Sequence, residues 1–391
     1  MPDHLVKVNE YAGLRWWRRC GRSKAHREML RAVAIAARGI PTPIPVICGE
    51  LRHGPLLECC YEVVPWLDDA IDLRNARDTG VGTAAERRAC VAALGVLVRR
   101  MHDSGIDQRD LAPNNFLWRR GADPTLLAID FERARVGASV ALAARVAALA
   151  KLDRHCATAS ASERMRFLYA YCAGDRVAAR SLSGAIEAAS AALLRRDATR
   201  WGRTATRRGR RFESVVLPVA GVQWRGWVRR GTSADALRDA VARPDAPAAT
   251  LALRAIDCVT GRAAAAVLGL ALALHQRAVL PAPVGLLCGA DRAWLILETT
   301  GTPIDPASES SERSRLVVLL DRLLSWGGLA SPLRLDAMAR IGSRCVLLDP
   351  SALRLEMPRV AVGRRALARR LANPLATPSR GVRGERDGSR P

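Results

Sequence analysis

One short polar loop constrains the fold of this chain more than any other feature of its sequence. The stretch DQRDLAPNNF (107–116) places Asp110 and Asn115 five residues apart, between an apolar helical stripe and an apolar strand. A loop held at both ends can direct a carboxylate and an amide at this interval into one pocket. Asp and Asn are also common in ordinary turns, so the loop alone is only moderately specific. Whether the loop is a functional site or an ordinary turn therefore has to be judged from the elements on either side of it.

The elements around this loop follow a definite order. The expected elements are a strand at 4–11, a helix at 24–38, strands at 44–51 and 55–64, a helix after Thr83, and a strand at 126–135. Ser23 caps the first helix, which Gly39 and Pro41 end. Its expected apolar face consists of Met29, Leu30, Val33 and Ala37. Thr83 and Glu86 form a capping box before the second helix, whose apolar stripe is Val91, Leu94, Val98 and Met101.

This is the order of a bilobal protein kinase, so the predicted fold class is α+β with a protein-kinase-like architecture. In such enzymes a strand lysine holds the nucleotide phosphates and a helix glutamate pairs with it, roles that fit Lys7 and Glu28. Asp110 would orient the acceptor hydroxyl and take its proton, while Asn115 and Asp130 would bind the metal. Each residue also has an ordinary interpretation as a turn residue, strand cap or solvated charge. Their occurrence together and in order favours phosphoryl transfer.

The first half also resembles the Kdo/heptose lipopolysaccharide kinase family, over roughly residues 4 to 200. The stretches that carry the resemblance are SKAHREMLRAVAIAARGIPTP (23–43), RRMHDSGIDQRDLAPNNFLW (99–118), LLAIDFERARV (126–136) and SERMRFLYAYCAG (162–174). The resemblance implies a protein-kinase-like fold and transfer of phosphate from ATP, with Mg²⁺, to a sugar of the lipopolysaccharide inner core. It assigns ATP binding to Lys7 and Glu28, catalysis to Asp110, and metal binding to Asn115 and Asp130.

Two departures from the family pattern affect these expectations. The His that usually precedes Arg–Asp in the catalytic loop is Gln108, which can still donate a hydrogen bond and brace the loop. Only six residues precede Lys7, where a glycine-containing hairpin should cover the phosphates. Either the true start lies upstream, which is the preferred interpretation, or the N-lobe is incomplete and ATP binding is impaired.

The second half repeats the pattern of the first, which indicates an internal repeat of domain size. Residues 270–289 echo 32–49, and CVLLDPSALRL (345–355) echoes LLAIDFERARV. A generic Leu- and Ala-rich composition is the alternative explanation of these echoes. The predicted division is a kinase-like domain at 1–200, a basic linker at 201–211, a degenerate kinase-like domain at 212–372 and a disordered tail at 373–391.

The expected second copy lacks the residues that phosphoryl transfer needs. Leu333 falls where Asp110 lies in the first copy, Met338 falls at Asn115, and Leu268 replaces Glu28. Asp349 matches Asp130, and Arg254 stands in for Lys7. Apolar side chains cannot bind metal or accept a proton, so a regulatory or scaffolding role is predicted for this copy.

Composition excludes some classes of function. The formal net charge is +23, and the basic residues are almost all arginines, since the only lysines are Lys7, Lys24 and Lys151. An arginine-rich codon bias therefore explains the charge as well as a polyanion-binding function does. No nucleic-acid-binding module is recognisable, and no nucleic-acid partner is expected. The ten cysteines have no zinc-ligand spacing. No signal peptide and no uncharged stretch of membrane-spanning length is visible, so a cytoplasmic location is predicted.

A basic aromatic segment, RWWRRCGR (15–22), suggests peripheral contact with the anionic inner membrane. Trp16 and Trp17 could insert at the interface while the arginines attract headgroups. Packing of both tryptophans inside the N-lobe is the alternative.

Two functions follow from these patterns. The first is an ATP-dependent phosphotransferase that acts on a lipopolysaccharide inner-core sugar or a related saccharide. The second is a non-catalytic tandem pseudokinase that serves as a membrane-associated regulator or scaffold.

Overall fold

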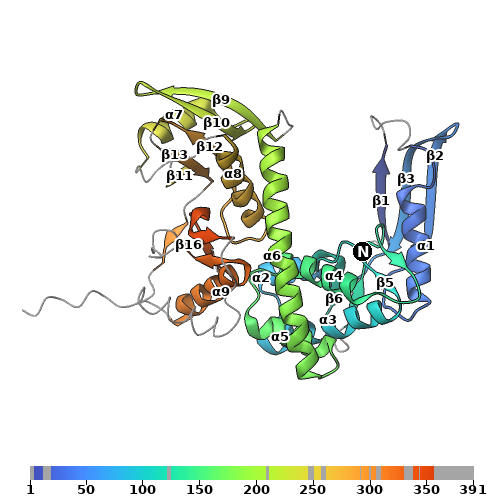
Figure 1. Cartoon of the computed structure of the whole chain (residues 1–391). Helices are drawn as coiled ribbons and strands as arrows, with labels where there is room; N and C mark the ends of the chain where they lie inside the picture. The colour runs from blue at the N-terminus through green and yellow to red at the C-terminus, as the bar shows by residue number, and fades with distance from the viewer. Residues whose placement is uncertain are drawn as a thin grey trace, which may run out of the picture. The chain divides into compact units, whose positions relative to one another are not determined.

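The computed structural model divides the chain into two units, Met1–Leu193 and Leu194–Pro391, which are described separately (Figure 1). The residues whose structure is described are 4–11, 19–120, 125–207, 211–244, 251–256, 261–290, 292–298, 301–304, 310–329, 338–342 and 344–355. Both units combine helices with small antiparallel sheets, which confirms the α+β class.

The first unit begins with a three-stranded antiparallel sheet that carries one helix. The strands β1 (His4–Glu10), β3 (Leu56–Pro65) and β2 (Ile47–His53) lie in the order β1-β3-β2. Helix α1 (Lys24–Ala36) connects β1 to β2 along the chain and packs on β2 and β3 (Figure 1). The strand and helix expected on either side of Ser23 are therefore confirmed.

The buried face of α1 is not the one that its apolar residues suggested. The helix buries Ala25, Glu28, Ala32 and Ile35. Leu30 and Val33, which were expected on the core side, are 49% and 45% exposed. Ser23 caps the helix, since its hydroxyl accepts a hydrogen bond from the amide of His26 at 3.1 Å. The expected apolar face was therefore wrong, and the helix presents a carboxylate to the sheet instead.

The rest of the first unit is mainly helical, with two small sheets inserted. Its helices are α2 (Leu73–Thr79), α3 (Ala84–Asp103), α4 (Leu142–His155), α5 (Ala161–Tyr171) and the first part of α6 (Arg176–Thr206). One sheet has the order β4-β6-β7, formed by β4 (Ala70–Asp72), β6 (Phe116–Arg119) and β7 (Thr125–Ala128). The other pairs β5 (Ile106–Asp107) with β8 (Arg135–Val136).

Helix α3 forms the centre of this helical region. Its capping box is present, with Thr83 and Glu86 bonded reciprocally, as predicted. The buried side of the helix includes Leu94, Leu97, Val98 and Met101, which join one core with residues of α4, α5, β6 and β7. Gly95 lets α5 approach closely, because a Cβ at that position would lie 2.4 Å from the carbonyl oxygen of Phe167.

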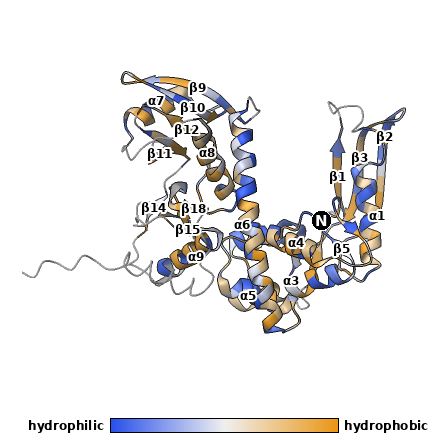
Figure 2. Cartoon of the chain, in the orientation of Figure 1, coloured by the Kyte–Doolittle hydropathy of each residue, from blue (hydrophilic) through white to orange (hydrophobic). Residues whose placement is uncertain are grey.

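The second unit begins with a five-stranded antiparallel sheet in the order β11-β13-β12-β10-β9. Its elements are β9 (Phe212–Val219), β10 (Val222–Arg229), α7 (Ala234–Ala242), β11 (Ala252–Ile256), α8 (Gly261–His275), β12 (Pro283–Cys288) and β13 (Ala293–Leu297). Strand β13 and most of β12 are fully buried, and Figure 2 shows α8 as largely hydrophobic.

The remaining elements of the second unit form two small sheets beside a helix. These elements are β14 (Thr302–Pro303), α9 (Ser310–Trp326), β15 (Gly328–Leu329), β16 (Met338–Ile341), β17 (Arg344–Leu347) and β18 (Leu353–Arg354). One sheet has the order β14-β16-β17 and the other pairs β15 with β18.

The pairing order of the first unit recurs in the second. The arrangement β1-β3-β2 matches β11-β13-β12, β4-β6-β7 matches β14-β16-β17, and β5-β8 matches β15-β18. Phe116 and Met338 each begin a middle strand and pair with the last residue of the next strand, Ala128 and Leu347. Met338 therefore corresponds to Phe116, one position beyond the Asn115 match that the sequence suggested. Leu333 lies outside the described residues.

The predicted basic linker is helical over much of its length. Helix α6 continues to Thr206, so residues 201–206 are not an irregular connection. Ala198 and Ala205 of this helix are buried. Gly202 meets Gly269 of α8, where an added Cβ on Gly269 would lie 2.5 Å from the amide nitrogen of Gly202. Tight packing of small residues therefore keeps this polar segment helical. The tail at 373–391 lies outside the described residues.

Within the part of the chain that the structure describes, α6 alone has the length and hydropathy that a membrane span needs. Of its most apolar window, 39% is buried in the protein. Figure 2 shows hydrophilic residues recurring along the helix. A core helix of a globular protein meets the same criterion.

Candidate nucleotide-binding site

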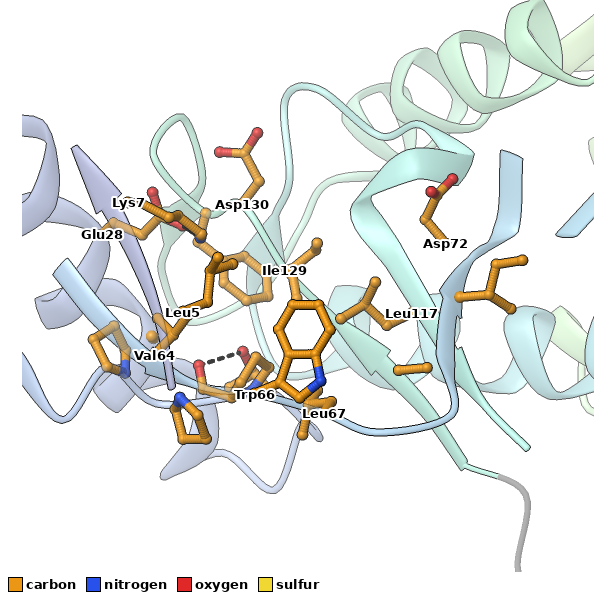
Figure 3. Close-up of a pocket in the computed structure, with 18 of the residues that line it drawn as sticks. Leu5, Lys7, Glu28, Val64, Trp66, Leu67, Asp72, Leu117, Ile129 and Asp130 are labelled. Atoms are coloured by element: carbon orange, nitrogen blue, oxygen red, sulfur yellow. Dashed lines mark hydrogen bonds and ion pairs between the residues drawn. The ribbon is translucent and has the colours of Figure 1, made fainter. Parts of the chain in front are cut away.

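A cavity of about 330 Å³ lies in the first unit between the β1-β3-β2 sheet and the helical region. Its apolar lining includes Leu5, Pro43, Pro45, Val64, Trp66, Leu67, Leu117 and Ile129. Lys7, Glu28 and Asp130 supply charge at one part of the wall, where Figure 3 shows Lys7 and Glu28 together and Asp130 beside them. A further carboxylate, Asp72, lines the wall near Leu117, apart from this group (Figure 3). A largely apolar cavity with a few charged groups suits a ligand with a flat apolar part and a polar tail.

Lys7 is held by two carboxylates. Its Nζ lies 3.6 Å from Glu28 Oε1 and 3.0 Å from Glu62 Oε1. Glu28 comes from α1, whereas Glu62 is the residue of β3 directly opposite Lys7 in the sheet register. The predicted Lys7–Glu28 pair is thus present, and the sequence interpretation missed its second acidic partner.

The protonation states of this group follow from burial and charge. Burial by itself would lower the pKa of Lys7, but the charges of Glu28 and Glu62 outweigh it and raise that pKa. Burial raises the pKa of Glu28, an effect that Lys7 opposes and the neighbouring carboxylates of Glu62 and Asp130 reinforce. Lys7 is therefore firmly cationic at neutral pH.

Asp130 occupies an unusual backbone position two residues after β7. Its φ is 59°, in the left-handed region that L residues other than Asn and Asp seldom adopt. The side-chain amide of Gln108 donates to the carbonyl oxygens of Ile129, at 3.0 Å, and Asp130, at 3.4 Å. Gln108 is buried, and it braces the strand end that carries Asp130. This is the bracing role expected of the residue that replaces the family His.

The loop that contains Asp110 and Asn115 is fixed by hydrogen bonds. Asn115 Nδ2 donates to the carbonyl of Asp110 at 2.7 Å, and the amide of Ile129 donates to the carbonyl of Asn115 at 2.9 Å. Asn115 is buried, whereas the side chain of Asp110 is 53% exposed and lies 3.9 Å from an Arg133 nitrogen. The side chain of Asn115 thus bonds back to the backbone of Asp110 and fixes the loop between them, while the Asp110 carboxylate faces solvent.

The structure brings three of the five predicted site residues to the cavity wall. Lys7, Glu28 and Asp130 line the cavity, while Asp110 and Asn115 are not among its lining residues. Asn115 is tied to the strand end before Asp130 through the Ile129 amide. The sequence interpretation missed Trp66, which lines the cavity, and Glu62, which contacts Lys7. Glu62 had a detectable signal, because it stands two residues from Cys60 and from Val64 and so lies on the same face of β3 as these apolar residues.

The donor groups suit a magnesium ion that also binds phosphate. Asp130 and Asn115 offer a carboxylate and an amide oxygen, which are ligand types that Mg²⁺ accepts. Among the described residues no group of three or more His, Cys, Asp or Glu side chains could hold a metal ion unaided. Few protein ligands are expected for Mg²⁺ in phosphate-transfer sites, because substrate phosphates complete the coordination.

The proposed membrane segment lies mostly outside the described residues. Trp16, Trp17, Arg15 and Arg18 belong to the range that the structure does not describe. Arg19 is described, and its Nε donates to the carbonyl of Leu57 on β3 at 2.9 Å. At least one arginine of the segment therefore contributes to the fold of the sheet.

A strand lysine paired with a helix glutamate, an aspartate at a strand end and a braced Asp–Asn loop define the nucleotide site of protein-kinase-like phosphotransferases. Residues 11–171 match the model of the Lipopolysaccharide kinase (Kdo/WaaP) family, which confirms the resemblance of the first half to that family. The match begins after Lys7 and includes Glu28, Asp110, Asn115 and Asp130.

Two known proteins are similar to parts of the chain. A 3-deoxy-D-manno-octulosonic acid kinase of Xanthomonas euvesicatoria pv. vesicatoria (strain 85-10) is 29% identical over 117 residues, which are 30% of this chain and 44% of that protein. The chain thus matches less than half the length of this curated relative. The solved structure of WaaP in complex with acyl carrier protein shares 22% identity over 47% of this chain and 76% of that chain, with a TM-score of 0.37. A TM-score of this size does not establish a shared fold.

Proposed function

We propose that the first unit is an ATP-dependent phosphotransferase that acts on a sugar of the lipopolysaccharide inner core or on a related saccharide. The observation that carries the proposal is the cluster of Lys7, Glu28 and Asp130 on the wall of one largely apolar cavity. The family match supports the choice of a saccharide acceptor.

The cavity suggests how the nucleotide binds. Apolar lining residues such as Pro43 and Pro45 provide a surface for the adenine ring. Figure 3 shows two others, Trp66 and Leu117, apart from Lys7 and Glu28 on the cavity wall. Lys7 then contacts the nucleotide phosphates, and Glu28 restricts the positions of its ammonium group. The protein thereby orients the phosphate chain before transfer, and such positioning accounts for most of the catalysis in phosphoryl transfer.

The chemical roles of the remaining residues follow from their positions. Asn115 and Asp130 would hold Mg²⁺, and the ion would neutralise charge on the transferred phosphoryl group. Asp110, exposed and on a fixed loop, accepts the proton of the acceptor hydroxyl as that oxygen attacks phosphorus. The bond to the leaving ADP oxygen breaks as the new bond forms.

Replacement of Asp110 by Asn tests this function in the full-length chain. We expect phosphate incorporation from ATP to fall by at least 100-fold, roughly the contribution of a positioned base. The melting temperature should stay unchanged, because the side chain is half exposed and its one ion pair is long. The assay measures transfer from labelled ATP to lipopolysaccharide core acceptors, and Asp107→Asn serves as the matched control. Wild-type turnover in the Asp110 variant would refute the assignment.

The second unit, we propose, is a degenerate copy of the first that has no phosphotransferase activity. The repeated pairing order of the sheets supports this proposal, as does the pairing of Arg254 with Leu295 where Lys7 pairs with Glu62. Leu268 of α8 is fully buried and offers no carboxylate to Arg254. The Asp110→Asn experiment also bears on this point, because an active second unit would leave residual turnover.

A further inference from the structure

The acid on β3 that contacts Lys7 has no role in the function proposed so far. Glu62 is 2% exposed and lies closer to the Lys7 ammonium than Glu28 does, at 3.0 Å against 3.6 Å. The two residues are direct partners in the antiparallel register, so the sheet itself holds them together. Burying a carboxylate is costly unless it is paired, and Lys7 is the pairing cation here.

The remaining oxygen of Glu62 makes the dependence on Lys7 stronger. Its Oε2 is also buried and finds no hydrogen-bond donor among the residues that the structure describes. The neighbour of Glu62 on the other side is Cys48 of β2, which brings no cation. Within the described residues, the attraction between Glu62 and Lys7 is thus the specific interaction that offsets the burial of this acid.

The second unit provides an internal comparison. The strand that corresponds to β3 carries Leu295 opposite Arg254, and Leu295 is fully buried. The same register position therefore accepts an apolar residue without loss of the sheet. A carboxylate at this position is not a requirement of the fold, which points to a requirement of the site.

We infer that Glu62 is a positioning residue of the nucleotide site, and that it anchors Lys7 from the sheet while Glu28 anchors it from helix α1. With two anchors on different elements, the ammonium group keeps its place on the cavity wall even when α1 shifts. Part of this inference rests on the proposed function, since it assumes that Lys7 binds nucleotide phosphates.

The inference can be tested without any activity, because the chain has only three lysines to distinguish by mass spectrometry. In the Glu62→Gln variant, Lys7 loses a neighbouring negative charge and its amine deprotonates more readily. We expect the rate of Lys7 acetylation at pH 9 to rise roughly 3- to 10-fold, since one pKa unit corresponds to a tenfold change in free amine. Lys24 and Lys151 should react at unchanged rates and serve as internal references.

Glu58→Gln is the matched control, because Glu58 lies on the same strand with an exposed side chain. A Lys7 acetylation rate in Glu62→Gln equal to that in Glu58→Gln would overturn the inference. This outcome would leave the phosphotransferase proposal intact. Conversely, if the chain had no ATP turnover, the rate of Lys7 acetylation would still show whether Glu62 acts on Lys7.

Steady-state kinetics provide a second readout that a purely structural role would not change. Glu62→Gln should raise the KM for ATP severalfold and leave the KM for the saccharide acceptor unchanged. The reason is that Lys7 contacts the nucleotide and not the acceptor. Equal changes in both constants, or none, would contradict a positioning role.

A double-mutant cycle covers the case in which Glu62→Gln folds poorly. Thermal unfolding would be measured for Lys7→Met, Glu62→Gln and the double variant. If Glu62 anchors Lys7, the Glu62 substitution destabilises the wild type but raises the melting temperature of Lys7→Met, where it removes an uncompensated buried charge. Additive effects would exclude the anchor.

Discussion

At the scale of single residues, a buried histidine gives the first unit a pH dependence that is unrelated to catalysis. His102 of α3 is buried, and its Nδ1 lies 2.8 Å from the hydroxyl of Tyr171 on α5. Burial lowers the pKa of His102 to about 4; the charge of Arg145 adds to this effect, and Asp103 opposes it. The imidazole is therefore neutral at physiological pH, and its Nδ1 shares a hydrogen bond with the tyrosine hydroxyl.

The pH dependence follows from the sign of this shift. Between the ordinary His pKa of 6.5 and about 4, the unfolded chain binds a proton that the folded protein does not. The free energy of unfolding should therefore decrease as the pH falls through this window, by roughly 2–4 kcal/mol from this residue. Urea unfolding at successive pH values should show a flatter profile for His102→Asn. His53→Asn, at an exposed strand position, is the control, and equal slopes in both variants would contradict the prediction.

How far single residues could be predicted depended on their surroundings. Lys7 and Glu28 were found because a charged residue in an apolar strand and one on a helix match a known order of elements. The face of α1 was assigned wrongly, because Leu30 and Val33 suggested burial and the structure buries Glu28 instead. Hydrophobic periodicity cannot reveal a helix whose buried face includes a carboxylate, since that carboxylate is stabilised by Lys7 from a distant part of the chain.

At the scale of elements, α1 is tied to the segment that follows Asp130. Lys24 Nζ lies 3.4 Å from Glu132 Oε2 and an Arg27 nitrogen lies 3.8 Å from Glu132 Oε1. Arg31 of the same helix donates to the backbone carbonyl of Glu132. The helix that carries Glu28 and the strand end that carries Asp130 are thereby fixed to each other through one residue.

Replacing Glu132 by Gln should loosen this tie. These ion pairs are partly exposed, so we expect the stability to fall by less than about 1 kcal/mol. The kcat/KM for ATP should fall roughly fivefold, which corresponds to about 1 kcal/mol of lost positioning. Glu10→Gln, at an exposed position on β1, is the matched control. A large loss of stability with unchanged kinetics would show that Glu132 supports the fold and not the site.

At the scale of the whole molecule, the pairing order of the strands can be compared with the echoes between the two halves of the sequence. The order β1-β3-β2, β4-β6-β7 and β5-β8 of the first unit recurs in three sheets of the second unit, one of which also contains β10 and β9. The segment after residue 200 was expected to be irregular because it is polar and basic, yet it is helical to Thr206. Its helical state depends on packing of Gly202 against Gly269, which are far apart in sequence, and composition cannot show such a contact.

An acceptor attached to lipid would require the protein to remain near the membrane. We predict that the full-length chain binds vesicles containing anionic lipid at low salt and dissociates as salt increases, with each arginine near the surface contributing roughly 1 kcal/mol. Substitution of Arg15 and Arg18 by Gln should reduce the fraction of protein that co-sediments with vesicles. The control Arg38→Gln, two residues after the end of α1, should not change this fraction. Arg19 is left unchanged because it donates to Leu57. No association at low salt would exclude the segment as an anchor.

The backbone of Asp130 also restricts how the proposed site could lose its chemistry during evolution. At a φ of 59°, Gly and Asn are the replacements that the backbone accepts without strain, and neither supplies a carboxylate. Gly would remove the proposed metal ligand and Asn would replace its charged oxygen by a neutral amide oxygen. Either mutation would preserve the fold, so selection for a folded protein would not remove it. A gene copy can thus lose its chemistry at this position and still encode a domain that persists as a binding or scaffolding module.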